Sequence, residues 1–142
     1  MKKALITGIS GFVGSHLAEH LLNNGYNVYG FSHPKHQTNN LSNVIKNIHL
    51  ENIDLQSEEK VNNSLKKNNF ELIFHLAAYS SPSQSFINPQ ETLINNIISE
   101  VNLLEATSKF CSDARVLIVG SCDEYGNVEE KYLPIDESAP LN

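Results

Sequence analysis

Three glycines near the start of the chain, Gly8, Gly11 and Gly14, stand three residues apart between an apolar run and an amphipathic pattern. This arrangement predicts a strand, a tight turn and a helix N-terminus, whose free N–H groups and positive dipole end attract an anion. Gly8 permits the turn, Gly11 leaves room for a pyrophosphate, and Gly14 lets the helix lie close to the strand. The turn therefore predicts a dinucleotide site, with further cofactor contacts from Ser10, Phe12 and Val13.

The residues after a second predicted strand, 27–31, should contact the ribose of the cofactor. NAD sites place a carboxylate there, whereas this chain has Ser32 and His33, with Lys35 and His36 just beyond. Hydroxyl and cationic groups suit a 2′-phosphate, so the sequence favours NADP, and NAD stays possible. The alternative interpretation is a solvated loop whose missing acid only weakens the selection of NAD.

Further candidates follow the next two strands. Asp54 and Leu55 come after the third strand, where the carboxylate could accept a hydrogen bond from an adenine amine; alternatively, Asp54 caps the next helix. His75 is expected to be hydrogen-bonded and partly buried, pointing away from the ligand. The segment expected to run along the cofactor consists of Leu76, Ala77 and Ala78.

The segment that follows the fifth predicted strand belongs to the same edge. Ser121, Cys122, Asp123 and Glu124 bring a hydroxyl, a thiol and two carboxylates there. Such groups can position a substrate and move protons. Cys122 has no evident activating base and is expected to be a small packed residue. The alternative for the two acids is a solvated loop.

Strand and helix patterns alternate along the chain, which predicts a parallel sheet with helices on both faces. Strands are expected at 4–7, 27–31, 48–53, 71–76 and 115–120, and helices at 12–24, 57–68 and 89–109. Ser57 is the expected cap of the second helix, and 79–88 is expected to be a polar loop. In the longest helix, a stripe of Leu93, Ile97, Val101 and Leu104 is expected to cover the sheet, with Ile94 and Ile98 at a dimer interface.

Composition narrows the class of protein. The 142 residues suit one domain, 1–142, and the net charge of −6 argues against nucleic acid or an anionic membrane as a partner. The two cysteines have no metal-ligand spacing, so no metal is expected and a reducing, cytoplasmic location is the simplest interpretation. No apolar run is long enough for a membrane span.

Together these motifs resemble the extended short-chain dehydrogenase/reductase family, the NAD(P)-dependent epimerases and dehydratases of nucleotide sugars. The resemblance covers the whole chain and rests on five motifs: Thr7-Gly8-x-x-Gly11-Phe12-x-Gly14-Ser15, Asp54-Leu55, His75-Leu76-Ala77-Ala78, Pro89-x-x-Thr92-x-x-x-Asn96 and Tyr125-Gly126. It implies a Rossmann-like doubly wound parallel sheet, truncated after the fifth strand. The chain looks most like the GDP-mannose 4,6-dehydratase and GDP-4-keto-6-deoxymannose reductase branch, which implies NADP and a GDP-sugar.

The resemblance also implies roles for individual residues. Ser121 corresponds to the catalytic Ser/Thr, and Asp123 stands where the dehydratases have a glutamate base. Asn96 would lie near the ribose of the cofactor, and Tyr79, Ser80 and Ser81 would form the substrate-contacting loop.

One departure affects activity. The family's catalytic Tyr-x-x-x-Lys pair is missing, since no tyrosine of this chain has a lysine four residues on. The C-terminal region that binds the sugar is absent as well. The chain is therefore expected to be the N-terminal part of such an enzyme, inactive alone and homodimeric in its complete form. The alternative is a non-catalytic dinucleotide-binding module.

Overall fold

The computed structural model describes residues 1–141 and contains one sheet of five parallel strands in the order β3-β2-β1-β4-β5. The strands are β1 (Lys3–Thr7), β2 (Asn27–Ser32), β3 (His49–Asn52), β4 (Leu72–His75) and β5 (Arg115–Ile118). The helices are α1 (Phe12–Asn23), α2 (Glu58–Asn68), α3 (Pro82–Ile87) and α4 (Pro89–Phe110). Three short 3-10 turns are η1 (Asn39–Leu41), η2 (Cys122–Tyr125) and η3 (Glu130–Tyr132). The predicted doubly wound α/β fold is confirmed.

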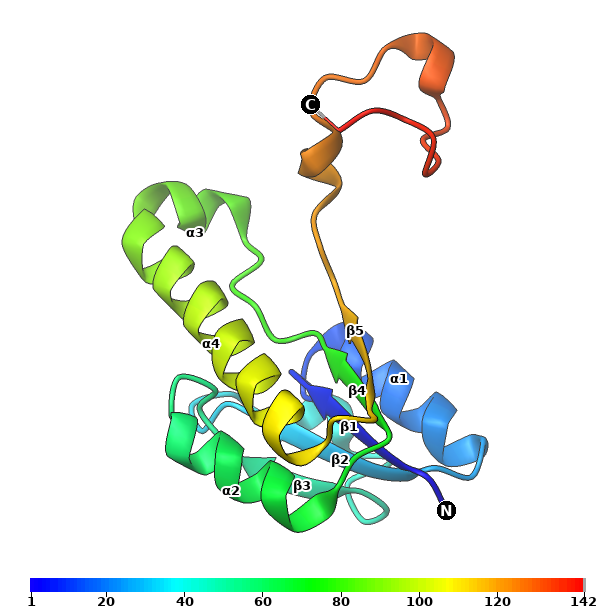
Figure 1. The fold of residues 1–142 in the computed structure, drawn as a ribbon, viewed down its shortest axis with the longest axis vertical. Helices are drawn as coiled ribbons and strands as arrows, with labels where there is room; N and C mark the ends of the chain where they lie inside the picture. The colour runs from blue at the N-terminus through cyan, green and yellow to red at the C-terminus, as the bar shows by residue number, and fades with distance from the viewer. Residues whose placement is uncertain (142) are drawn as a thin grey trace.

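Helices cover both faces of the sheet, with α1 on one side and α2 and α4 on the other (Figure 1). Successive residues of β1 alternate between the two faces, as the pleat of a strand requires. Ala4 and Ile6 belong to the core under α1, and Leu5 belongs to the core under α2 and α4. A sheet buried on both faces explains why its strands read as continuous apolar runs.

The charged side chains at the two ends of α2 complement the helix dipole. Glu58 and Glu59 lie in its first turn and Lys66 and Lys67 in its last. The expected side-chain cap by Ser57 is wrong, because the Ser57 side chain makes no capping hydrogen bond. Ser57 is nevertheless the N-cap residue by position, and its N–H donates to the carbonyl of Asp54 in the turn that precedes the helix.

The buried face of α4 differs from the predicted one. The apolar stripe expected to cover the sheet is exposed, as are the two isoleucines expected at a dimer interface, Ile94 and Ile98. Each of these side chains is exposed to between 37% and 59%, and the stripe consists of Leu93, Ile97, Val101 and Leu104. The buried residues are instead Ser99, Leu103, Ala106 and Thr107. Their spacing marks one helical face, and the small side chains of Ser99, Ala106 and Thr107 let α4 lie close to α2.

The expected polar loop before α4 contains the helix α3. Ser81 is its N-cap, accepting a hydrogen bond from the Gln84 N–H, and Pro82 occupies its first turn. Ser and Pro in these two positions are a helix-start signal.

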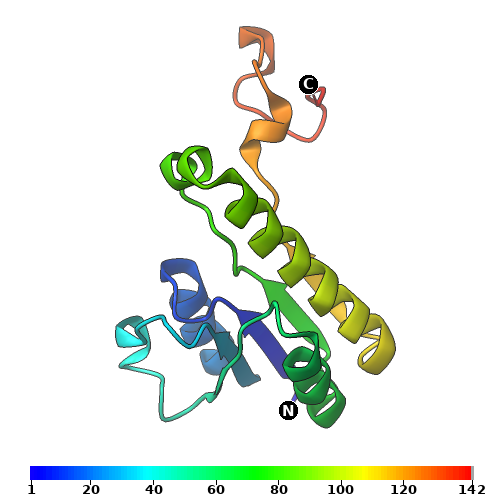
Figure 2. The same cartoon turned by 90° about the vertical axis from the view of Figure 1, so that its left-hand side faces the viewer.

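The segment after β5 leaves the sheet and projects away from the body of the molecule (Figures 1 and 2). β5 ends at Ile118, two residues earlier than predicted. Cys122 begins η2 on this segment and is exposed, so the expectation that it is packed is wrong.

Candidate functional site

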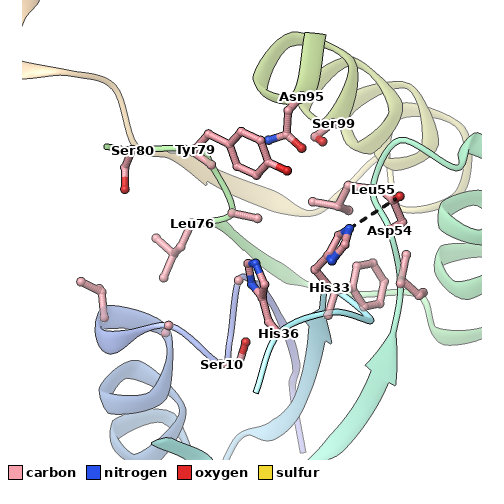
Figure 3. A pocket seen from close by; sticks show the side chains of 18 of the residues that line it. Ser10, His33, His36, Asp54, Leu55, Leu76, Tyr79, Ser80, Asn95 and Ser99 are labelled. Atoms are coloured by element: carbon pink, nitrogen blue, oxygen red, sulfur yellow. Dashed lines mark ion pairs between the residues drawn. The ribbon is translucent and has the colours of Figure 1, made fainter. Parts of the chain in front are cut away.

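A cavity of about 340 Å³ opens at the carboxyl edge of the sheet, between the start of α1 and the middle of α4 (Figure 3). Of the predicted cofactor residues, it is lined by Gly8, Ser10, Gly11, Phe12, Val13, Gly14, His33, Asp54, Leu55, Leu76, Ala77 and Ala78. Ser80, predicted to contact substrate, also lines it. The chain thus brings the turn after β1 and the loops after β2, β3 and β4 to one cavity.

The glycine turn forms the cavity's floor. Gly8 has φ +68°, and a Cβ there would lie 3.0 Å from the Ala77 Cα. A Cβ on Gly14 would collide with the Gly8 carbonyl oxygen and lie 2.8 Å from the Ile9 Cα. The structural roles expected of these two glycines are therefore confirmed, since one needs the left-handed conformation and the other needs close packing. The pyrophosphate role of Gly11 stays a prediction.

The N-terminus of α1 faces this turn with nothing from the chain to neutralise it. Gly11 is its N-cap, no side chain caps it, and its first turn holds no acidic residue. The first N–H groups of a helix need acceptors from outside the helix. An anionic group in the cavity would supply them and would meet the positive end of the helix dipole.

The end of β2 is arranged differently from the prediction. The Ser32 side chain is fully buried and donates a hydrogen bond of 2.9 Å to the Ser10 hydroxyl. Ser32 and the exposed Lys35 do not line the cavity, whereas His33 and His36 do. The hydroxyl and the lysine expected to bind a 2′-phosphate are therefore not brought to the cavity.

Asp54 lies opposite the loop that follows β2. Its Oδ2 is 3.7 Å from the Nε2 of His33, the contact drawn as a dashed line in Figure 3. Its Oδ1 accepts a hydrogen bond from the Gln56 N–H. Neither contact caps α2 through the side chain, so Asp54 presents a carboxylate to the cavity from the end of β3.

A chain of amide side chains links the β3 loop to the β4 loop along the rim of the cavity. Gln56 Nε2 donates to Asn95 Oδ1, and Asn95 Nδ2 donates to Asn96 Oδ1. Asn96 then accepts from the Tyr79 N–H at 2.8 Å and donates to the Tyr79 carbonyl at 3.2 Å. The Asn96 amide therefore holds the β4 loop against α4, and Asn96 itself does not line the cavity.

Sequence reasoning missed four lining residues, namely Phe31, Ile53, Asn95 and Ser99, whereas Tyr79 belongs to the loop predicted to contact substrate. The spacing of Asn95 and Ser99 by four residues was the available signal, because such positions share one helical face. Periodicity of apolar residues pointed to a neighbouring face of the same helix.

Thr7, at the end of β1, connects the sheet to the wall of the cavity. Its Oγ1 lies 2.8 Å from His75 Nδ1 and accepts hydrogen bonds of 3.2 Å from the N–H groups of Leu76 and Ala77. His75 is 7% exposed and hydrogen-bonded, as expected. Burial lowers the pKa of His75 below its ordinary value, and the Glu100 carboxylate partly offsets that effect.

Three other predicted site residues lie away from the cavity. Ser81 caps α3, and Ser121 and Asp123 belong to the segment that projects beyond β5. The Ser121 hydroxyl accepts a hydrogen bond from the Asp123 N–H, at 3.1 Å. The catalytic roles of Ser121 and Asp123 stay predictions.

Residues 1–141 contain neither a metal-binding cluster nor a membrane-spanning helix. No three His, Cys, Asp or Glu side chains are grouped so that they could hold a metal ion. None of the helices in this part of the chain has the length and apolar character needed to cross a membrane.

The strand order and the cavity at the end of β1 define a Rossmann-like α/β protein whose cavity lies at the topological switch point of the sheet, the place where such folds bind ligands. The sequence profile of the GDP-mannose 4,6-dehydratase family matches residues 5–142. The chain belongs to this family.

Named relatives are similar over most of the chain. UDP-glucose 4-epimerase of Caenorhabditis elegans is 30% identical over 148 residues, covering 95% of this chain and 42% of that protein. UDP-glucuronic acid decarboxylase 1 of Danio rerio is 34% identical over 128 residues, covering 90% of this chain and 29% of that protein. The chain therefore spans less than half the length of either relative.

Solved structures share the fold. UDP-glucose 4-epimerase from Bifidobacterium longum, solved in complex with NAD⁺ and UDP, is 27% identical with a TM-score of 0.86. The match covers 99% of this chain and 43% of that one.

Proposed function

We propose that residues 1–142 form the dinucleotide-binding domain of an epimerase or dehydratase that acts on a nucleotide sugar. One observation carries the proposal: the uncapped start of α1 and the glycine turn after β1 face the same cavity as the backbone of Leu76 and Ala77. A pyrophosphate fits this cradle because it supplies acceptors for the free N–H groups. When bound, the nicotinamide would accept a hydride from a sugar carbon and return it.

NAD is the proposed cofactor. The sequence favoured NADP because of Ser32 and Lys35, but the Ser32 hydroxyl is occupied by Ser10 and Lys35 stays outside the cavity. The Asp54 carboxylate that does line the cavity would repel a 2′-phosphate. The Bifidobacterium longum epimerase, whose structure contains NAD⁺, supports the same choice.

The proposed substrate is a UDP-sugar. The sequence favoured a GDP-sugar, in line with the name of the family, whereas the named relatives and the solved neighbour above are UDP-sugar enzymes. Ser80, which lines the cavity, is the proposed substrate contact. Ser121 and Asp123 are the proposed catalytic residues, in an enzyme that would act as a homodimer.

Titration calorimetry of the 142-residue chain tests the proposal. We expect NAD to bind more tightly than NADP, and Gly11→Val to abolish NAD binding by filling the pyrophosphate space. Gly120→Val is the matched control, because a Cβ at Gly120 meets nothing closer than 3.8 Å and this glycine does not line the cavity. Equal NAD affinity of the wild type and Gly11→Val would contradict the site.

The same method compares the nucleotide parts of the substrate. UDP and GDP are titrated into the NAD-loaded enzyme that contains this chain together with its C-terminal substrate region, and tighter binding of UDP is expected. Tighter binding of GDP would restore the GDP-sugar and overturn the proposed UDP-sugar, with no effect on the dinucleotide site.

A further inference from the structure

We infer that Thr7 and His75 are positioning residues. Their hydrogen bonds, here called the latch, hold the Leu76–Ala77 wall of the cavity against the glycine turn, and they fix His75 in one tautomer. The inference rests on the proposed dinucleotide site for its effect on binding. The latch itself is a property of the chain, and it can be tested without any ligand.

The other hydrogen bonds of the Thr7 hydroxyl determine which atom donates in its contact with His75. A hydroxyl has two acceptor lone pairs and one proton. The N–H groups of Leu76 and Ala77 can only donate, and both point at Thr7 Oγ1. They occupy the two lone pairs, so the hydroxyl proton is left for His75 Nδ1, which lies 2.8 Å away.

This direction fixes the state of the imidazole. Because Nδ1 accepts the Thr7 proton, a neutral His75 ring must carry its own proton on Nε2. A proton on Nδ1 would face an oxygen whose acceptor positions are already filled. The burial of His75, which lowers its pKa, acts in the same direction, while Glu100 on α4 is the carboxylate that opposes it.

The backbone that the latch holds forms part of the cavity. Thr7 and His75 are paired residues of the β1–β4 ladder, and the chain leaves that ladder immediately after His75. Leu76 and Ala77 then line the cavity without a strand partner, and a Cβ on Gly8 would lie only 3.0 Å from Ala77 N. The N–H bonds to Thr7 therefore set how closely this segment approaches the turn that would hold the pyrophosphate.

Nitrogen-15 NMR of the wild-type chain tests the fixed tautomer. At neutral pH, we expect His75 Nδ1 to give the shift of an unprotonated nitrogen that accepts a hydrogen bond, and Nε2 the shift of a protonated one. A protonated Nδ1 in the wild type would overturn the inference.

Two substitutions at one position test what the latch holds. Thr7→Val keeps the shape of the side chain but removes the hydroxyl, whereas Thr7→Ser retains it. We expect the Leu76 and Ala77 amides to exchange with solvent at least about tenfold faster in Thr7→Val, and at nearly the wild-type rate in Thr7→Ser. Unchanged exchange in Thr7→Val would overturn the latch even if the protein binds no dinucleotide.

The affinity for NAD tests the consequence. We expect Thr7→Val to raise the Kd for NAD about tenfold, and Thr7→Ser to restore it to within about threefold of the wild type. Wild-type affinity in Thr7→Val would show that the latch does not position the cavity. Absence of NAD binding by the wild type would instead refute the proposed function, while the exchange and tautomer measurements would still decide the latch.

Discussion

The buried hydroxyl of Ser32 sets a limit on what can be changed at the end of β2. Its hydrogen bond to Ser10 lies inside the protein, so an acid introduced there would be a buried charge without a partner. We expect Ser32→Asp to lower the free energy of unfolding by about 3–5 kcal/mol. Urea denaturation measures this loss, and Ser42→Asp, at an exposed serine, is the control. A stable Ser32→Asp protein with altered cofactor preference would show that Ser32 contacts the ribose after all.

His33 is the residue of this loop from which cofactor choice can be altered, because its side chain lines the cavity beside Asp54. We expect His33→Arg to raise the affinity for NADP relative to NAD, since a guanidinium pairs with a 2′-phosphate and also offsets the Asp54 carboxylate. Calorimetric titration with both dinucleotides gives the ratio. Lys35→Arg, outside the cavity, should leave it unchanged.

The depressed pKa of His75 makes the stability of the fold depend on pH. The unfolded chain takes up a proton at the ordinary value near 6.5, whereas the folded chain resists protonation because His75 is buried. The contribution of His75 is therefore complete above pH 6.5 and is lost as the pH falls below it. Urea denaturation at a series of pH values between 5 and 8 should show this decline.

The chain contains five other histidines, so the wild-type curve alone does not isolate His75. His75→Asn keeps a hydrogen-bond acceptor for Thr7 but cannot take up the proton. Its curve should decline less steeply below pH 6.5. Identical slopes for the two proteins would contradict the assignment.

At the scale of elements, α4 shows what the sequence could predict and what it could not. Its existence and its start at Pro89 follow from periodicity and from the proline, and the structure confirms both. Which face of α4 is buried could not be predicted, because two different faces of the helix could each pack against the rest of the protein. Apolar periodicity selects the stripe of Ile97, whereas close packing against α2 selects the one that contains Leu103 and small side chains.

The elements around the site divide in the same way. The glycine turn could be predicted from the sequence, because glycine is the residue that tolerates the conformation and the close contacts of this turn. The loop after β2 could not, because whether Ser32 faces the cavity or the protein interior depends on Ser10, a residue of another loop. The contact between Asn96 and Tyr79 likewise depends on the path of the β4 loop.

A pair of alanine substitutions distinguishes the two faces of α4. Leu103→Ala should lower the free energy of unfolding by about 2–5 kcal/mol, because it leaves a cavity in the core. Ile97→Ala should change it by no more than about 0.5 kcal/mol, since the side chain is 54% exposed. Chemical denaturation of both variants gives the comparison. Equal losses would mean that Ile97 is buried in solution.

At the scale of the whole molecule, two apolar surfaces lie open. One is the exposed stripe of α4, and the other is β5, a strand at the edge of the sheet with Leu117 and Ile118 exposed. An open edge strand and a large apolar patch both favour association. We expect the 142-residue chain to associate with increasing concentration, which light scattering coupled to gel filtration measures. Ile97→Lys should reduce the association, and Ile45→Lys, at an exposed isoleucine away from α4, should not.

The central position of β1 has a consequence for the order in which the chain acquires its structure during synthesis. β1 is made first, but one of its two neighbours in the sheet, β4, lies far along the chain: Thr7 meets His75 across a separation of 68 residues. Contacts between such distant residues form late, because a long loop must close first. On the ribosome, the glycine turn would therefore wait, without its second wall, until Ala77 has left the exit tunnel. A nascent chain shorter than this contains the glycine turn but lacks the segment that forms the other wall of the cavity.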